Sequence, residues 1–304
     1  MPKPPIHRSQ PPNIQKAIQQ AVDFHKQGKL KDAERLYQAV LKLRPDHFDA
    51  LHLLGVLRAQ QGSPQEAVKL ISHALERQPH AAEAHSNFGS ALAALNRHEE
   101  AIASYDKALA IKPAHTDALY NRGSALAQLN RYEEAIASYD KALAIQPNAS
   151  AFYNRGNALK ALNRHKEAIA SYDQALAIKP DHVDALYNRG NALDKLNRYE
   201  EAILSFDKAL TLKPDHADAL TNRGNALQAL NRHEEALASY DKALTLKPDY
   251  KYAFGDAAHC RAHICDWRNR NLMEQQLVDD VRSGKPVSTP FPFLAISDSP
   301  ADQL

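Results

Sequence analysis

The chain has 304 residues, of which 44% are hydrophobic but only 7% aromatic, a balance that indicates many small contacts instead of a large aromatic core. Lys and Arg number 38 and Asp and Glu 36, so the charge favours neither nucleic acid nor an anionic membrane as a partner. No stretch approaches the ~18–20 apolar residues of a membrane span or resembles a signal peptide, and Cys260 and Cys265 are too few for a disulfide framework, so we expect a cytoplasmic protein.

The first segment, residues 1–12, is rich in proline and is predicted to be disordered. Beyond it, prolines recur every 34 residues with one interval of 33: Pro45, Pro79, Pro113, Pro147, Pro180, Pro214 and Pro248. These prolines divide residues 13–250 into seven repeats, at about 14–47, 48–81, 82–115, 116–148, 149–182, 183–216 and 217–250. A fixed period of this length is typical of stacked helical units.

Each repeat is predicted to be a pair of antiparallel helices. A small residue recurs in the first helix (Gly55, Gly89, Gly123, Gly156, Gly190, Gly224), and an alanine followed four residues later by a large side chain recurs in the second (Ala101 and Tyr105, for example). The small positions let the two helix axes approach closely. Gly or Asn between the helices favours the left-handed conformation that ends a helix, and the proline stops the second helix.

The combined pattern, G-x-x-L…A-x-x-x-Y…P at a period of 34, resembles the tetratricopeptide repeat (TPR). The resemblance implies an all-α fold, a right-handed α-solenoid in which the first helices line the concave side. Stacking buries the apolar face that no single repeat can bury alone. The short interval at residues 147–152 is predicted to be absorbed by a loop, with the stack continuing through it.

Two polar rows and a tyrosine row follow the glycine register and are predicted to line a peptide-binding groove. Asparagine stands two residues before the glycine, Ser or Asn one residue after it, and tyrosine three residues before it in several repeats. An asparagine amide both donates and accepts, which suits it to bind the backbone of an extended peptide. The alternative is that the asparagines only reflect recent duplication. The candidate residues are Asn87, Asn121, Asn154, Asn188, Asn222, Ser90, Ser124, Asn157, Asn191, Asn225, Tyr120, Tyr153 and Tyr187.

An arginine row lies beside these positions, at Arg122, Arg155, Arg189 and Arg223. We interpret it as structural, with the arginine stems lying over the neighbouring helix. The alternative is stacking on nucleic-acid bases or pairing with acidic peptides. The fifteen histidines are scattered and are interpreted as solvated surface residues instead of metal ligands.

The sequence contains no complete catalytic motif. Ser104-x-x-Lys107 and its repeats satisfy an S-x-x-K pattern, but they recur on successive second helices and lack the companion elements of that enzyme class. No phosphate-binding loop or zinc motif occurs in the sequence. We therefore expect no enzyme activity from residues 1–304 alone, no cofactor and no metal, and we expect protein or peptide segments as partners.

The C-terminal part departs from the repeat. Residues 251–267 resemble only a first helix and are predicted to cap the stack, residues 268–285 to form a helix, and residues 286–304 to be a Pro-rich apolar tail. The sequence from Ala258-His259-Cys260 to Cys265-Asp266-Trp267 resembles the junction before the catalytic region in SPINDLY-type and bacterial protein O-GlcNAc transferases. This resemblance implies an alternative function, substrate recognition for such a glycosyltransferase, whose absent catalytic domain could dock at residues 286–304. It also implies that the asparagine row contacts the backbone of bound substrates.

Overall fold

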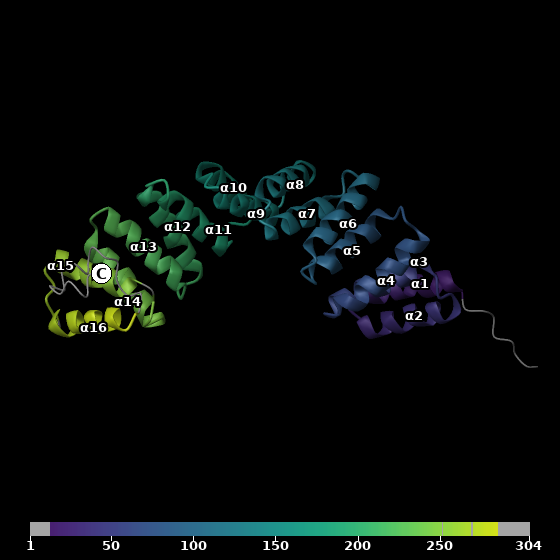
Figure 1. The fold of residues 1–304 in the computed structure, drawn as a ribbon, viewed down its shortest axis with the longest axis horizontal. Helices are drawn as coiled ribbons and strands as arrows, with labels where there is room; N and C mark the ends of the chain where they lie inside the picture. The colour runs from purple at the N-terminus through teal and green to yellow at the C-terminus, as the bar shows by residue number, and fades with distance from the viewer. Residues whose placement is uncertain (1–12, 251, 269, 285–304) are drawn as a thin grey trace, which may run out of the picture. The chain divides into compact units, whose positions relative to one another are not determined.

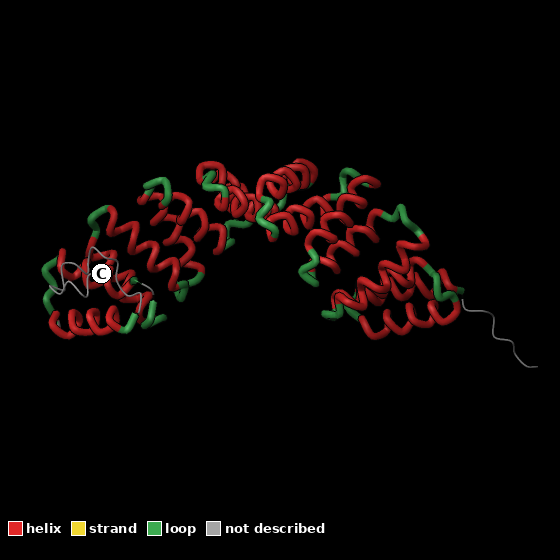
Figure 2. Tube along the Cα trace, in the orientation of Figure 1, coloured by secondary structure: helices red, strands yellow, loops and turns green. Residues whose placement is uncertain are grey.

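The computed structural model describes residues 13–250, 252–268 and 270–284, and every regular element within them is a helix (Figure 1; Figure 2). The first eight helices are α1 (Ile14–Lys26), α2 (Leu30–Leu43), α3 (Phe48–Gln60), α4 (Pro64–Arg77), α5 (Ala82–Ala93), α6 (His98–Ile111), α7 (Thr116–Gln128) and α8 (Tyr132–Ile145). The others are α9 (Ala149–Ala161), α10 (His165–Ile178), α11 (Val183–Asp194), α12 (Tyr199–Leu212), α13 (Ala217–Ala229), α14 (His233–Leu246), α15 (Ala253–His263) and α16 (Arg270–Arg282). The predicted all-α solenoid of paired helices is confirmed.

The chain divides into two compact units between Gln146 and Pro147, so that unit 1 holds α1–α8 and unit 2 holds α9–α16. Within each unit every helix packs on the next one along the chain. The division falls at the one 33-residue interval of the repeat. Continuity of the stack through that loop stays a prediction.

In the first helices of repeats two to seven the glycine is required by the ring or branched side chain opposite it, whereas α1 has Ala21 in this register. A Cβ atom built on Gly89 would lie 2.7 Å from Cε1 of Tyr105, and one on Gly190 would lie 2.5 Å from Cε1 of Phe206. Both distances are far below van der Waals contact. The predicted steric role of the small positions is confirmed, because any larger residue would push the paired helices apart.

The turns between paired helices use the left-handed conformation, as the sequence predicts. Asn96, Asn130, Asn163, Asn197 and Asn231 have φ between 57° and 59°, and Gly28 and Gly62 have φ of 73° and 77°. Asparagine tolerates this region better than other residues with a side chain. A short turn of this kind returns the chain so that the second helix packs on the first.

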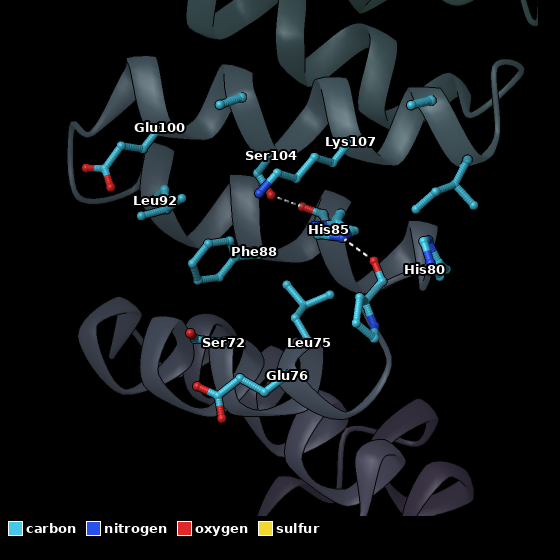
Figure 3. Close-up of a pocket in the computed structure, with 14 residues that line it drawn as sticks. Ser72, Leu75, Glu76, His80, His85, Phe88, Leu92, Glu100, Ser104 and Lys107 are labelled. Atoms are coloured by element: carbon cyan, nitrogen blue, oxygen red, sulfur yellow. Dashed lines mark hydrogen bonds between the residues drawn. The ribbon is translucent and has the colours of Figure 1, made fainter.

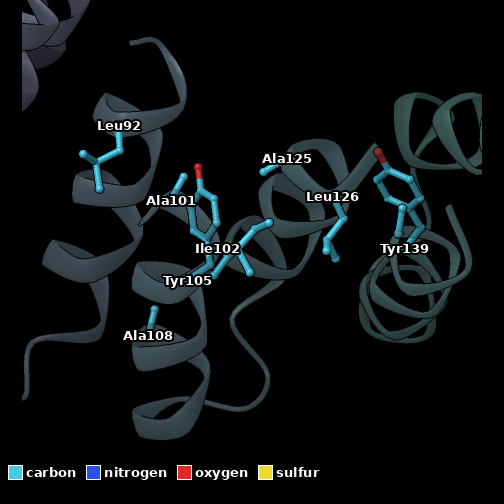
Figure 4. Close-up of a cluster of buried hydrophobic side chains, with 10 residues drawn as sticks. Leu92, Ala101, Ile102, Tyr105, Ala108, Ala125, Leu126 and Tyr139 are labelled. Carbon is cyan, nitrogen blue, oxygen red and sulfur yellow. The ribbon is translucent and has the colours of Figure 1, made fainter. Parts of the chain in front are cut away.

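The cores are built from alanines and one large side chain per repeat, an aromatic ring in all but the second repeat, which has Ile71. In one cluster of unit 1, Tyr105 and Tyr139 are each 1% exposed, and Leu92 and Leu126 pack beside them (Figure 4). In unit 2, Tyr240 packs with the buried Cys260 of α15, which covers α14. The predicted capping segment, residues 251–267, thus contains α15, and the predicted helix over 268–285 corresponds to α16.

Leu277 of α16 is fully buried against Phe254 of α15. The disordered segment predicted at residues 1–12 and the tail predicted at residues 286–304 lie outside the described residues. No helix in the described ranges is long and apolar enough to cross a membrane.

Candidate functional site

The asparagine row lies where successive odd-numbered helices meet. Within unit 1, α3 contacts α5 and α5 contacts α7; within unit 2, α9 contacts α11 and α11 contacts α13. The side of each unit that these helices form is called the odd-helix face below. The row of Asn87, Asn121, Asn154, Asn188 and Asn222, called the asparagine ladder, runs across it.

In unit 2 each of two ladder amides reaches back to the preceding repeat. Nδ2 of Asn188 donates to Oη of Tyr153 at 3.2 Å and to Oδ1 of Asn157 at 3.1 Å. Nδ2 of Asn222 makes the same two bonds one repeat later, to Tyr187 at 3.2 Å and Asn191 at 2.8 Å. The structure therefore brings three of the predicted rows together into one network.

In unit 1 the contacts of the ladder are fewer. Nδ2 of Asn121 donates to Oγ of Ser90 at 3.4 Å, and the amide of Asn87 lies 2.9 Å from Nε2 of His52. A depression of about 210 Å³ lies here and is lined by Ser90, Ala93, His98, Tyr105, Asn121, Ser124, Ala125 and Gln128. This part of the face is therefore hollowed and lined by side chains that donate and accept hydrogen bonds.

The network leaves some hydrogen-bonding capacity unused. The amides of Asn121, Asn188 and Asn222 donate to side chains of the chain itself, and the Oδ1 atom of Asn188 already accepts from Lys160. The Oδ1 atom of Asn222 can still accept a hydrogen bond from a guest. The Tyr153 and Tyr187 hydroxyls accept from the ladder and keep their own O–H to donate. Access differs along the row, since Asn188 is only 9% exposed and the other four ladder residues are partly exposed.

The tyrosine rings form a second layer under the ladder. Tyr153 packs on Tyr172 and on the ring of His182, whose centroid is 4.7 Å away, and Tyr187 repeats this arrangement with His216 at 4.8 Å. Tyr120 packs on Tyr139 at 6.0 Å. Such ring contacts hold the hydroxyl groups in place. Histidines at the ends of the inter-repeat turns thus support the face, a role that the sequence analysis did not assign to them.

The arginine row points to the opposite side, between even-numbered helices. Nε of Arg122 donates to Asp106 of α6 at 2.6 Å, and its Nη1 donates to Ser138 of α8 at 2.7 Å. Three such sets, called arginine bridges below, are Asp106–Arg122–Ser138, Asp173–Arg189–Ser205 and Asp207–Arg223–Ser239. Because these guanidinium groups are bonded between helices, they support the structural interpretation over base stacking.

The α4–α6 junction in unit 1 has no arginine bridge. Phe88 occupies the arginine position there, and Ser72 occupies the aspartate position. A cleft of about 700 Å³ lies between α4 and α6, with Leu75, Phe88 and Leu92 among its lining residues (Figure 3). Two of the lining residues are bonded to each other: Nε2 of His85 donates to the carbonyl oxygen of Pro79 at 2.8 Å. This cleft lies between even-numbered helices, away from the asparagine ladder.

The interpretation of all histidines as solvated residues was wrong. His52 and His85 are each 8% exposed and His115 is 5% exposed, because each lies at a contact between successive repeats. His233 of α14 stacks on His263 of α15 with ring centroids 4.3 Å apart. Burial, with repulsion from His263, lowers the pKa of His233. Across the described part of the chain, no group of three or more His, Cys, Asp or Glu side chains is arranged to hold a metal ion.

The sequence analysis also missed a register four residues after the glycine. Ala93 occupies it in the lining of the unit 1 depression. In unit 2 the register holds Lys160 and Asp194, and Nζ of Lys160 donates to Oδ1 of Asn188 at 3.0 Å. The signal available from sequence was the replacement of alanine by charged residues in two successive repeats.

Comparisons with known proteins agree with this architecture. Models described as tetratricopeptide repeat or TPR repeat match residues 24–95, 89–130, 116–148, 153–216 and 217–250. Among solved structures, YrrB, described as a TPR protein with an unusual peptide-binding site, is 29% identical with a TM-score of 0.57, covering 63% of this chain and 97% of YrrB. No curated protein matches the chain.

Two further structures show the fold alone, since their identity is low. A tetratricopeptide repeat protein from Parabacteroides merdae is 22% identical, with a TM-score of 0.56, and the match covers 81% of this chain and 98% of that one. The C-terminal part of a TPR protein from Cytophaga hutchinsonii is 18% identical, with a TM-score of 0.65, covering 79% and 98%.

Proposed function

Since the chain belongs to the tetratricopeptide repeat family, we propose that it is a protein-interaction scaffold that binds segments of other proteins, in extended conformation, along the odd-helix face. The observation that carries the proposal is the regular arrangement of the asparagine ladder and the tyrosine hydroxyls. Acceptors and donors repeat once per repeat along this face. The backbone of an extended peptide offers N–H and C=O groups in the same alternating way.

The chemistry of the face favours recognition of backbone over side chain. The Oδ1 atom of Asn222 can accept a peptide N–H, and the hydroxyl of Tyr187 can donate to a peptide C=O. Both groups are already positioned by bonds to other repeats, so little side-chain freedom is lost when a guest binds. Similarity to YrrB supports the proposal, because that TPR protein is described as having an unusual peptide-binding site.

The function is tested by selecting peptides and then removing the ladder. A phage library of random 12-residue peptides is panned on the full chain, and the best peptide is synthesised with a fluorescein label. We expect Asn121→Ala, Asn188→Ala and Asn222→Ala together to weaken its binding at least tenfold in fluorescence anisotropy. Gln174→Ala, an exposed change on α10, is the matched control and should bind as the wild type does.

A second peptide separates backbone from side-chain recognition. The same peptide carrying N-methyl groups on alternate residues loses its N–H donors and should bind at least tenfold more weakly. Circular dichroism checks that the triple variant keeps its helices. Undiminished binding by a folded triple variant, or a library from which nothing is enriched, would show that the odd-helix face is not a peptide site.

The alternative function, substrate recognition for a glycosyltransferase whose catalytic part is absent here, rests on the sequence from Ala258 to Trp267. In the structure this segment includes most of α15 and the turn after it, where Cys260 is buried and Trp267 is 52% exposed. Burial of Cys260 explains the first cysteine by packing. The alternative is tested by mixing the chain and a labelled nucleotide sugar with separately expressed glycosyltransferase domains and measuring sugar transfer to the selected peptide.

A further inference from the structure

The register four residues after the glycine differs between the two units. In unit 1 it holds His25 in the first repeat and then Ala59, Ala93 and Ala127, and in unit 2 it holds Lys160, Asp194 and Gln228. Its side chains lie beside the ladder: Ala93 lines the same depression as Asn121, and Lys160 bonds to Asn188. The odd-helix face of unit 2 therefore carries Lys and Asp where three repeats of unit 1 carry methyl groups.

The two charges in this register are partly buried and make no ion pair among the described residues, although the nearby Lys195 offsets part of the effect of burial on Asp194. Nζ of Lys160 bonds to a neutral amide, and burial lowers the pKa of its ammonium group. The carboxylate of Asp194 makes no hydrogen bond or ion pair within the part of the chain that the structure describes, and burial raises its pKa. A partly buried charge without a partner is costly, so each favours an opposite charge supplied from outside.

A third charge takes the place of a ladder residue at the end of the row. Asp256 of α15 lies 34 residues after Asn222, in the same register. An aspartate cannot donate, so it cannot make the two bonds that Asn222 makes to the preceding repeat. Its carboxylate makes no hydrogen bond or ion pair with the described residues, and burial together with the charge of Asp256 raises the pKa of Tyr240.

The hydroxyl of Tyr240, whose pKa the charge of Asp256 affects, is shared between two amide oxygens. The hydroxyl of Tyr240 lies 2.8 Å from Oδ1 of Asn225 and 2.8 Å from Oε1 of Gln228, and its single proton can serve only one of them. The carboxylate adds two further acceptor atoms. A guest ammonium or guanidinium group would bring the missing donors together with the opposite charge.

We propose, on the premise that the odd-helix face binds extended segments, that unit 2 selects segments carrying an acidic side chain near Lys160 and basic side chains near Asp194 and Asp256. Unit 1 places no charge in this register and exerts no such selection there. The ladder alone recognises only the backbone of a bound segment. The charges add selection among its side chains and fix the direction in which the segment binds.

The spacing of the guest charges follows from the helices. Adjacent packed helices lie about 8–10 Å apart, and an extended chain rises roughly 3.3 Å per residue. The acidic residue and the first basic residue should therefore be separated by about three positions. The second basic residue should follow about five or six positions later, because Asp256 lies two repeats beyond Asp194.

The test uses two fluorescein-labelled 14-residue peptides of Gly, Ser and Ala that carry charges at this spacing. One carries Glu, Lys and Lys; the other is its charge-swapped counterpart with Lys, Glu and Glu; each is made in both chain directions. We expect one direction of the first peptide to bind the full chain at least tenfold more tightly than either direction of the second.

Lys160→Gln with Asp194→Asn should abolish most of that preference, and Lys160→Glu with Asp194→Lys should reverse it. Asp215→Asn, an exposed change in a turn, is the charge-matched control.

The outcomes separate this inference from the proposed function. Suppose that the wild type and the charge variants bind both peptides with the same affinity, and that the triple ladder variant (Asn121→Ala, Asn188→Ala and Asn222→Ala) binds neither peptide. The charge selection is then wrong, and the peptide site stands. If the ladder variant binds both as the wild type does, the peptide site itself is wrong. Because the Lys160→Gln and Asp194→Asn pair only removes charge, it keeps the test decisive if the reversed pair fails to fold.

Discussion

The two units build the same helix pair but differ on both sides of it. On the odd-helix face, unit 1 has serines after the glycine and a depression of about 210 Å³, whereas unit 2 has asparagines there and tighter contacts along the ladder. Between even-numbered helices, unit 1 has one junction with Phe88 and an open cleft, whereas unit 2 closes two junctions with arginine bridges.

The comparison teaches that adjacent residues on one helix serve separate purposes. Asn222 and Arg223 are neighbours on α13, yet Asn222 bonds to α11 and Arg223 bonds to α12 and α14. Successive residues on a helix are turned by about 100°, so they face different elements. Changes on the even-helix side should therefore alter stability, and changes on the odd-helix face should alter binding.

The largest expected effect comes from breaking an arginine bridge in unit 2. Arg223→Ala leaves the carboxylate of Asp207 and the buried hydroxyl of Ser239 without their shared donor. Hydrogen bonds to charged groups contribute about 1.5–3 kcal/mol, so we expect a loss of about 2 kcal/mol. Urea unfolding measures it, and hydrogen exchange should place the loss in α12–α14. Lys208→Ala, an exposed change on α12, should have little effect.

Peptide binding by the folded Arg223→Ala variant should match that of the wild type. A tenfold loss of binding with intact ladder contacts would contradict the separation of the two sides.

The second effect concerns Asp256, which follows the last asparagine of the ladder in the same register. Burial raises the pKa of Asp256 to about 6 from the usual 3.8, so the folded chain holds its proton more tightly than the unfolded chain does. Stability must then fall as pH rises through this window, and the carboxylate is destabilising above about pH 6. We expect Asp256→Asn to have little effect at pH 4 and to stabilise unit 2 by about 2 kcal/mol more at pH 7.5 than at pH 4.

Paired urea titrations of wild type and the Asp256→Asn variant at both pH values measure this difference. The other carboxylates are common to the two proteins, and their contributions cancel. A stabilisation that is equal at pH 4 and pH 7.5 would mean that the carboxylate is not the cause.

The sequence predicted the fold because the repeat encodes the close contacts directly. Gly89 and Tyr105 stand at fixed positions in their repeat, and the ring lies where a Cβ would otherwise be. The asparagines of the turns were also predictable, since few other residues adopt a positive φ at low cost. Such features are local, with cause and effect in the same helix pair.

The site was less predictable because its contacts join different repeats. The bond from Asn188 to Tyr153 spans 35 residues, and no local pattern states whether an amide faces a guest or another repeat. The division at Gln146 was likewise hidden, although one shortened interval marked the place. The partners of the arginines were missed for the same reason, since Asp106, Arg122 and Ser138 lie on three different helices.

The smallest effect comes from installing an arginine bridge in unit 1. Ser72→Asp with Phe88→Arg reproduces at α4–α6 the set that Asp106, Arg122 and Ser138 form at α6–α8, because Ser104 already occupies the third position. Each change alone should destabilise, since it leaves a new charge without its partner. Because such ion pairs are partly exposed, a double-mutant cycle should give a favourable coupling of only about 1 kcal/mol. No coupling would mean that α4 and α6 lie too far apart for the bridge. In that case the cleft beside Phe88 would reflect the spacing of the helices and not the missing arginine.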